Sequence, residues 1–304
     1  MEEIISPFTS KNDVTLVREV SADYVIDAYQ KAFEIDIRSY FIKPTIQTIK
    51  LYRCNDSNYY FYYPFGLTGN ATLYDQLSKL DWYYLPWKWE YAEASEHIKP
   101  NTKLLEIGCG PGNFLENIEL PNHLKTGLEL SLSLAKATQK KHLNVLTETV
   151  QAHAQKNKHQ YDLVCSFQVL EHVADVGEFL KSCISCLKKD GKLIISVPNK
   201  DAFPKYDWKN DLLNLPPHHM GLWNTQSLRS IARQFGITLV SIRKEPLQPY
   251  HFQWYQSIQE KKYLRNKLFS LIYRKSRINK LFSYYIAKKA HKITGHTIQA
   301  IYTI

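Results

Sequence analysis

Short apolar runs alternate with helical stretches from Thr102 to the end of the sequence. Each run has the length of one buried strand, and the segments between them have the spacing of amphipathic helices. Strands that alternate with helices form βαβ units, which assemble into a parallel sheet. The pattern predicts an α/β fold with a mostly parallel sheet and helices on both faces. The runs are 103–107, 124–130, 143–146, 162–166, 192–197 and 237–242, and a last alternating segment follows at 298–304.

A glycine-rich turn follows the first of these runs. Gly108, Gly110 and Gly112 come directly after the strand, and a helical stretch begins immediately afterwards. Glycine lets the backbone bend sharply and lets a ligand approach the amides, which face the ligand at the start of a helix. The turn therefore predicts a cofactor site, which we assign to Glu106, Gly108, Cys109, Gly110, Gly112, Asn113 and Phe114.

The spacing of the glycines separates two kinds of cofactor. The dinucleotide fingerprint G-x-G-x-x-G would need its third glycine at position 113. That position holds Asn113, and the glycine comes one residue earlier. A nicotinamide cofactor is therefore disfavoured.

A carboxylate follows the second strand. Glu129 lies at the strand tip, 19 residues after Gly110. A carboxylate in that place can accept hydrogen bonds from both ribose hydroxyls of a bound nucleoside. Because enzymes that bind NAD use the same contact, Glu129 with Leu130 and Ser131 indicates a nucleoside without identifying it.

Three motifs together resemble the class I S-adenosylmethionine-dependent methyltransferases, a broad family that includes ubiquinone-type O-methyltransferases. The first is G-x-G-x-G with Glu106 two residues before it; the others are YDLVCSFQVLEHV at 161–173 and LKKDGKLIISVPN at 187–199. The resemblance implies S-adenosylmethionine as cofactor and a seven-stranded Rossmann-like sheet whose last strand, here 298–304, is antiparallel. It also implies that Phe167 and Gln168 approach the methionine part of the cofactor, and that Glu148 and Thr149 lie near adenine.

Three histidines are candidates for the chemistry. Methyl transfer requires the acceptor atom to be held in line with the methyl group, and a hydroxyl acceptor usually also needs a base. His172 follows the fourth strand, and His218 and His219 follow the fifth, at the edge where α/β sheets bind ligands. We predict His219 as the general base, and the alternative is a hydrogen-bonded loop that shapes the pocket.

A divalent metal is a further alternative. Some relatives, including ubiquinone-type enzymes and small-RNA 2′-O-methyltransferases, bind one with E-x-x-E-H and a downstream histidine. This sequence has Gln168 where the first carboxylate would stand, followed by Glu171 and His172. A neutral amide weakens a site for a hard cation, so metal is disfavoured here.

The predicted organisation has three parts. Residues 1–74 form a small N-terminal appendage that resembles the degenerate zinc-ribbon-like module of some bacterial methyltransferases. The matching stretches are SPFT at 6–9 and CNDS at 54–57, where only Cys54 is a thiol, and zinc needs four ligands. We therefore predict a metal-free appendage. Residues 75–101 form an aromatic helical linker that either packs on the sheet or covers the acceptor, and 102–304 form the core, with a helical insertion at about 246–293 before the last strand.

The positive charge is concentrated in one segment. Eleven of the 39 Lys and Arg residues lie between 261 and 304, where there is no Asp or Glu. Basic amphipathic helices at 261–292 could contact an anionic membrane or a glycolipid, form a dimer surface or simply be solvated. Because the sequence shows neither a signal peptide nor a membrane-spanning run, we expect a cytoplasmic protein, with contact to the inner face of the membrane as the alternative.

These observations predict a methyltransferase for a small-molecule acceptor, with a hydroxyl of a sugar, glycolipid precursor or secondary metabolite as acceptor. An RNA methyltransferase is favoured by the basic segment but disfavoured by Gln168 and by the absence of a recognisable RNA-binding module. A non-catalytic scaffold that binds the nucleoside is the third hypothesis.

Overall fold

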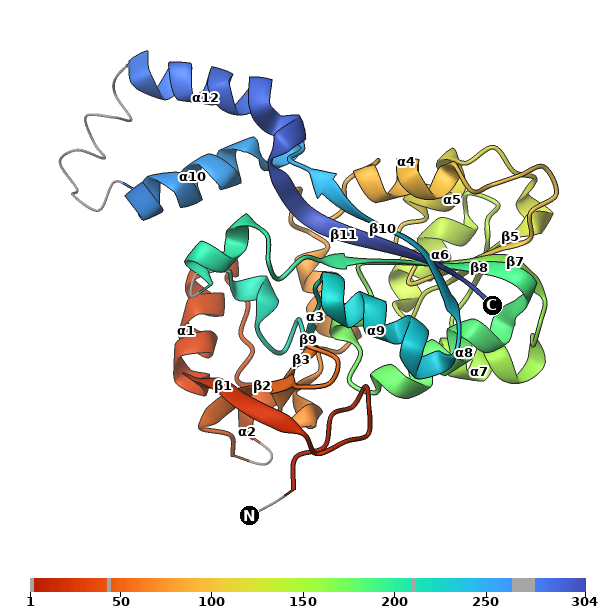
Figure 1. Cartoon of the computed structure of the whole chain (residues 1–304), viewed down its shortest axis with the longest axis horizontal. Helices are drawn as coiled ribbons and strands as arrows, with labels where there is room; N and C mark the ends of the chain where they lie inside the picture. The colour runs from red at the N-terminus through yellow and green to blue at the C-terminus, as the bar shows by residue number, and fades with distance from the viewer. Residues whose placement is uncertain (1–2, 43–44, 209–210, 264–276) are drawn as a thin grey trace.

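The computed structural model describes residues 3–42, 45–208, 211–263 and 277–304. Seven strands form its main sheet, in the order β10-β11-β8-β7-β4-β5-β6 (Figure 1). β11 runs antiparallel to both neighbours, and the other adjacent pairs are parallel. The predicted sheet with an antiparallel last strand is confirmed. Its strands are β4 (Leu104–Ile107), β5 (Lys125–Leu128), β6 (Asn144–Leu146), β7 (Tyr161–Phe167), β8 (Leu187–Pro198), β10 (Thr238–Pro246) and β11 (Thr294–Thr303).

Successive side chains of the strands face two helical layers. Leu105 and Ile107 pack with three helices on one face of the sheet, whereas Leu104 packs with three helices on the other. This follows from the alternation of side chains along a strand, since both faces of a parallel sheet are covered. The first layer is α7 (Val150–Lys156), α8 (Val176–Cys186) and α9 (Thr225–Phe235), and the second is α4 (Trp89–Ser95), α5 (Asn113–Asn117) and α6 (Leu132–Gln139).

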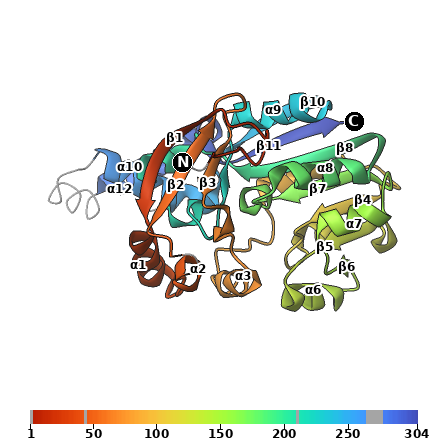
Figure 2. The same cartoon turned by 90° about the horizontal axis from the view of Figure 1, so that it is seen from below.

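The N-terminal region builds a second, antiparallel sheet beside the core (Figure 2). Three of its strands come from the first 74 residues, and the fourth, β9, comes from the chain after β8. A separate hydrophobic cluster joins this region to residues 212–222. The predicted appendage is thus continuous with the core. Its elements are β1 (Val14–Ser21), β2 (Thr48–Cys54), β3 (Tyr60–Tyr63), β9 (Gly221–Leu222), α1 (Ala22–Phe33), α2 (Ser39–Ile42) and α3 (Ala71–Leu77).

The four positions that match the ligands of a zinc ribbon lie close together in this region. Cys54 Sγ is 3.3 Å from Thr9 Oγ1, and both side chains are buried. Burial acts to raise the pKa of Cys54, but hydrogen bonds from Ser57, Thr9 and Ser6 lower it. Hydrogen bonds among hydroxyls and one thiol therefore hold the two loops together.

Residues 75–101 are helical only at 75–77, the end of α3, and at 89–95, which form α4. The chain makes successive turns between α3 and α4, around Pro86. The aromatic side chains of this stretch lie against different partners: Tyr83 Oη is 2.8 Å from His218 Nε2, and the ring of Tyr84 lies beside Gly110. A regular helix could not serve both contacts, because neighbouring residues of a helix point about 100° apart.

Two helices, α10 (Phe252–Tyr263) and α12 (Arg277–Lys289), lie between β10 and β11 and project from the body of the protein (Figure 1). Phe203, Leu247, Ile258 and Ile286 form the hydrophobic cluster at their base. Part of the predicted basic segment, residues 264–276, lies outside the described residues. None of the described helices combines the length and the apolarity needed to cross a membrane.

Candidate active site

The glycine turn has the sharply bent backbone that its sequence predicts. Gly108, Gly110 and Gly112 have φ angles of 69°, 52° and 77°, in the left-handed region where side chains are disfavoured. A Cβ on Gly108 would lie 2.5 Å from Val169 Cγ2, and one on Gly112 would lie 2.4 Å from Thr138 Cγ2. Packing and backbone conformation therefore both require glycine at these two positions.

Glu129 closes the turn from the neighbouring strand. One carboxylate oxygen accepts a hydrogen bond from the amide of Gly110 at 2.9 Å, and the other accepts one from the amide of Ser131 at 2.7 Å. Burial raises the pKa of Glu129, while these amides act to lower it. The carboxylate is thereby fixed at the tip of β5, facing the turn.

One cavity of about 920 Å³ runs from this turn across the carboxyl edge of the sheet. Nine residues of the predicted cofactor site line it: Gly108, Cys109, Glu129, Leu130, Ser131, Glu148, Thr149, Phe167 and Gln168. The remaining five lie behind its wall. Gly110 and Gly112 shape the turn, and Asn113 donates to the carbonyl of Leu85 at 3.0 Å. Phe114 packs in the core beside Tyr91 and Phe167, and Glu106 is 2% exposed with Oε2 unpartnered.

Lys88 also lines the cavity and was not predicted from the sequence. It is the only Lys or Arg among the described lining residues, which include five carboxylates: Glu90, Glu129, Glu148, Glu171 and Asp211. Its positive charge acts to lower the pKa of two of the buried acids, Glu106 and Glu171, although burial raises both. Among the described lining residues, the Lys88 ammonium is therefore the one lysine or arginine charge that could pair with an anionic group of a ligand.

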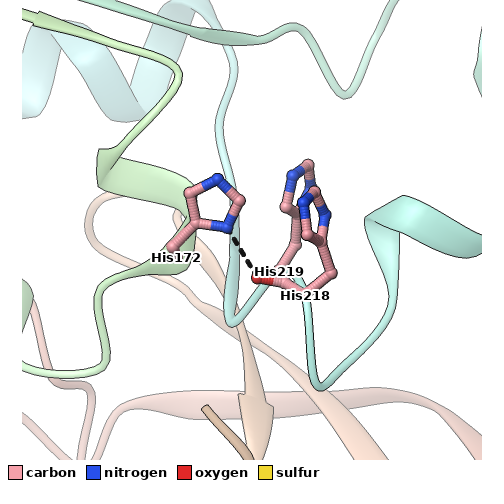
Figure 3. Close-up of side chains that lie close together, drawn as sticks. All are labelled: His172, His218 and His219. Carbon is pink, nitrogen blue, oxygen red and sulfur yellow. Dashed lines mark hydrogen bonds between the residues drawn. The ribbon is translucent and has the colours of Figure 1, made fainter. Parts of the chain in front are cut away.

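Three imidazoles gather at the other end of the cavity (Figure 3). The rings of His218 and His219 are stacked with centroids 4.5 Å apart, and the ring of His172 stands edge-on to both at 4.6 and 4.8 Å. All three residues line the cavity. The predicted catalytic histidines are thus brought together although α8 and β8 separate His172 from the other two in sequence.

The hydrogen bonds of these rings fix their tautomers. Nδ1 of His172 lies 2.7 Å from the carbonyl oxygen of His218, and Nδ1 of His218 lies 2.9 Å from that of Leu213. A carbonyl can only accept, so both Nδ1 atoms carry hydrogen and both Nε2 atoms carry a lone pair.

His219 is oriented by a relay of side chains. Its Nδ1 lies 2.8 Å from Asn214 Oδ1, and the amide nitrogen of Asn214 donates to Asp211 at 2.5 Å. Because Asp211 takes the amide hydrogens, the amide oxygen faces His219 and accepts from Nδ1. Nε2 of His219 is therefore the free acceptor.

Glu171 lies between two of these lone pairs. Its side chain is 2% exposed, Oε1 is 4.0 Å from Nε2 of both His172 and His219, and neither oxygen has a hydrogen-bond partner among the described residues. Burial raises the pKa of Glu171 to about 8 and lowers the pKa of His172 to about 4. Burying a carboxyl without a hydrogen-bond partner is costly. A bound group that donates a hydrogen bond or a positive charge to Glu171 would therefore stabilise this arrangement.

These residues fit a divalent metal better than the sequence indicates. Two imidazole lone pairs and an orphaned carboxylate converge, and the other ring nitrogen of each histidine is anchored, as in protein metal sites. Nitrogen-rich ligand sets suit transition metals such as zinc rather than magnesium. Gln168, which replaces the first carboxylate, instead donates to Glu90 at 3.3 Å.

The N-terminal region holds the histidine loop in place. Tyr29 and Tyr62 donate their hydroxyls to the carbonyls of Leu212 and Asn214 at 3.2 and 2.9 Å. The amide of Gly69 donates to the carbonyl of Pro217 at 2.7 Å. Both tyrosines are fully buried. These long-range bonds position a loop that has little regular structure of its own.

Comparison with known proteins agrees with this geometry. A family model described as a methyltransferase domain matches residues 83–242, more than half of the chain. This chain belongs to the class I S-adenosylmethionine-dependent methyltransferases. The cofactor predicted for the glycine turn and Glu129 is therefore S-adenosylmethionine.

Individual relatives of this methyltransferase match a shorter segment. The ubiquinone biosynthesis O-methyltransferase of Yersinia enterocolitica is 34% identical over 107 residues, which are 33% of this chain and 44% of the relative. That of Vibrio cholerae is 33% identical over 107 residues, 33% of this chain and 43% of the relative. The matches thus span less than half of those relatives.

Solved structures cover more of the chain at lower identity. A SAM-dependent methyltransferase from Archaeoglobus fulgidus is 19% identical, covers 70% of this chain and 92% of its own, and has a TM-score of 0.47. The cyclopropane synthase MmaA2 of Mycobacterium tuberculosis is 17% identical, with 71% and 83% coverage and a TM-score of 0.47.

Proposed function

We propose that this chain transfers a methyl group from S-adenosylmethionine to a hydroxyl of a small molecule, namely a sugar, a glycolipid precursor or a secondary metabolite. The observation that supports it best is the joining of two sites in one cavity. The glycine turn with Glu129 lies at one end, and a buried set of one carboxyl and three neutral imidazoles lies at the other. Such a set provides proton acceptors opposite a methyl donor, as an oxygen acceptor needs.

The cofactor end offers a partner to each polar part of S-adenosylmethionine. Glu129 would accept the ribose hydroxyls, and Gly108 and Cys109 line the same space. Lys88, which lines the cavity, would pair with the α-carboxylate, and Glu90, which also lines it, would lie near the α-ammonium. Opposite charges in a buried cavity favour one orientation of this zwitterion.

At the acceptor end, His219 would take the proton of the hydroxyl. Its Nε2 carries the lone pair, and its Nδ1–H donates to Asn214, which Asp211 holds in turn. Glu171, whose Oε1 is 4.0 Å from Nε2, would stabilise a positive charge on the imidazole when its own carboxyl is ionised. His172 contacts the same carboxyl, and His218 supports the loop through Tyr83.

Glu171, His172 and His219 would also hold a divalent metal, which when bound would lower the pKa of a coordinated hydroxyl. Elemental analysis of protein purified without chelators tests this assignment. We expect about one equivalent of a transition metal, lost in Glu171→Gln and kept in His123→Ala, which changes an exposed histidine away from the cavity. If the wild-type protein contains no bound metal, even after incubation with zinc, the metal assignment is rejected and only the proton-acceptor role remains.

The methyl donor is tested first by calorimetric titration. S-adenosylmethionine and NAD are titrated separately into the wild-type protein and into Glu129→Ala. We expect micromolar binding of S-adenosylmethionine alone, weakened by about 1–3 kcal/mol in the variant through lost charge-assisted bonds. Absence of binding to the wild type would reject the proposed activity.

The partner surface that we propose is an anionic membrane, contacted by α12. Leu281, Tyr284 and Tyr285 are 56–69% exposed and lie on one face of the helix, next to Lys280 and Lys288. Tyrosine and lysine beside an apolar residue suit the headgroup region of a bilayer. The test is co-sedimentation with phosphatidylcholine vesicles with and without phosphatidylglycerol. We expect binding only to the charged vesicles and its loss when all three residues are changed to serine; equal binding by this variant would reject the surface.

A further inference from the structure

Another wall of the same cavity is formed by the helical insertion and β11. Tyr250 and His251 precede α10, Trp254 lies in its first turn, and His296 and Thr297 lie on β11. None of these residues belongs to the three methyltransferase motifs. The insertion therefore contributes a part of the cavity that the proposed cofactor contacts leave unused.

Aromatic rings form most of this wall. The ring centroid of His296 lies 5.3 Å from that of Trp254 and 5.6 Å from that of His251. The ring centroids of Tyr250 and His251 are 4.6 Å apart. The ring of Phe203, which belongs to the hydrophobic cluster at the base of α10, packs against Trp254 with the ring centroids 4.9 Å apart. The wall is thus held in place by packing before any ligand arrives.

Two imidazoles in this wall lack hydrogen-bond partners. Nδ1 of His251 is buried without one, and no hydrogen bond is found for the ring of His296 among the described residues. The nearby carboxyl of Glu245 is 3.9 Å from His251 and is satisfied by Tyr250 and by the amide of Thr297, at 2.8 and 2.9 Å. Nδ1 of His251 is inaccessible, but both residues line the cavity, so the remaining ring nitrogen of His251 and the ring of His296 are left for a ligand.

Two buried carboxyls and one lysine surround this wall. Glu90 and Glu245 are buried on one side, and Lys88 lies close enough to act on both imidazoles. Burial, with this lysine, lowers the pKa of His251 to about 4 and that of His296 to about 3, so both rings are neutral near pH 7. A neutral imidazole offers one donor and one acceptor, which matches a hydroxyl group and not a phosphate.

We propose that Tyr250, His251, Trp254 and His296 form the binding site for a neutral sugar ring of the acceptor. The ring would lie against Trp254, and its hydroxyls would bond to the two imidazoles. This inference rests on the proposed transfer to a hydroxyl, and it narrows the three acceptor classes to those that carry a sugar. A flat phenol would use the aromatic wall but would leave the imidazoles unpaired, which is costly in a buried site.

Saturation-transfer NMR on the full chain tests the site. Each sample contains S-adenosylhomocysteine and one probe: the methyl glycosides of glucose, galactose and mannose, glucose 6-phosphate, or catechol. We expect a signal from at least one methyl glycoside, reduced about fivefold or more in Trp254→Ala and in His251→Phe, which removes the nitrogens and keeps a ring. Trp87→Ala is the matched control, because Trp87 is exposed and does not line the cavity.

The outcomes separate the two proposals. A signal from S-adenosylhomocysteine without one from any glycoside would reject the sugar site and leave the methyltransferase proposal standing. Preference for catechol or for the phosphate, or glycoside signals unchanged in both variants, would also reject the site. No signal from S-adenosylhomocysteine in the wild type would reject the proposed activity itself. Thermal unfolding of each variant shows whether a lost signal comes from unfolding.

Discussion

The two ends of the cavity are held by different parts of the polypeptide. The cofactor end is mainly backbone: three glycines with positive φ, the amides of the turn, and one carboxylate bound to those amides. The acceptor end is mainly side chains: imidazoles oriented by carbonyls and by an Asp–Asn relay, with tyrosines of the N-terminal region behind them. A backbone site depends on few side chains beyond its glycines, here Glu129 and Lys88, whereas a side-chain site changes its chemistry with each substitution. The first suits a cofactor shared by a family, and the second suits one acceptor.

The largest effect that we expect is on turnover, from the acceptor end. His219→Ala removes the proposed proton acceptor, so kcat should fall by about 10²- to 10⁴-fold with any acceptor found. Calorimetric affinity for S-adenosylhomocysteine should stay the same, because His219 lies at the other end of the cavity. His123→Ala serves as control. A large loss of cofactor affinity in His219→Ala would show that the two ends are not separable.

The next effect concerns the backbone end. Gly108→Ala places a Cβ at positive φ and against Val169, which we expect to lower the free energy of unfolding by about 2–4 kcal/mol. Affinity for S-adenosylhomocysteine should fall at least about 30-fold. Gly236→Ala is the matched control, since Gly236 also has positive φ but has open space around a Cβ. It should lose about 1–2 kcal/mol of stability and no affinity, as measured by denaturation and calorimetry.

Lys88 is a side-chain contact within the backbone end, and it sharpens the comparison. Lys88→Met should weaken S-adenosylhomocysteine by about 1.5–3 kcal/mol, the range of a charge-assisted bond. Affinity for methylthioadenosine, which lacks the amino-acid part, should be unchanged. Lys99→Met, at an exposed lysine outside the cavity, should leave both affinities as they are. An equal loss of affinity for both ligands would show that Lys88 does not bind the α-carboxylate.

The smallest effect comes from the support behind the histidine loop. Tyr62→Phe deletes the hydroxyl that donates to the carbonyl of Asn214 and keeps the buried ring. We expect a loss of about 1 kcal/mol in stability and a fall of a few-fold in kcat with cofactor affinity kept. Denaturation and steady-state kinetics measure both. A change in cofactor affinity alone would contradict the division between the two ends.

The residues of the predicted cofactor end could be assigned from the sequence because they are close together in the chain. The turn and Glu129 lie within 22 residues and follow two strands with a clear pattern. Lys88 could not be predicted, since nothing local marks it as facing the cavity. Two further features could not be predicted because they depend on loops and an insertion that only the folded sheet brings together. They are the contact of Glu171 with His219 and the aromatic wall formed by Trp254 and His296. The turns between α3 and α4 were missed because aromatic residues there suggested a helix while their partners lie elsewhere.

The place of β11 in the sheet has a consequence for synthesis on the ribosome. β11 lies between β8 and β10, and β10 pairs with no other described strand. β8 and β10 are therefore synthesised before β11, and the edges that pair with it stay unpaired while the helical insertion is translated. Such edges can pair with other chains, so this interval is when the nascent protein is most prone to aggregate and most in need of a chaperone.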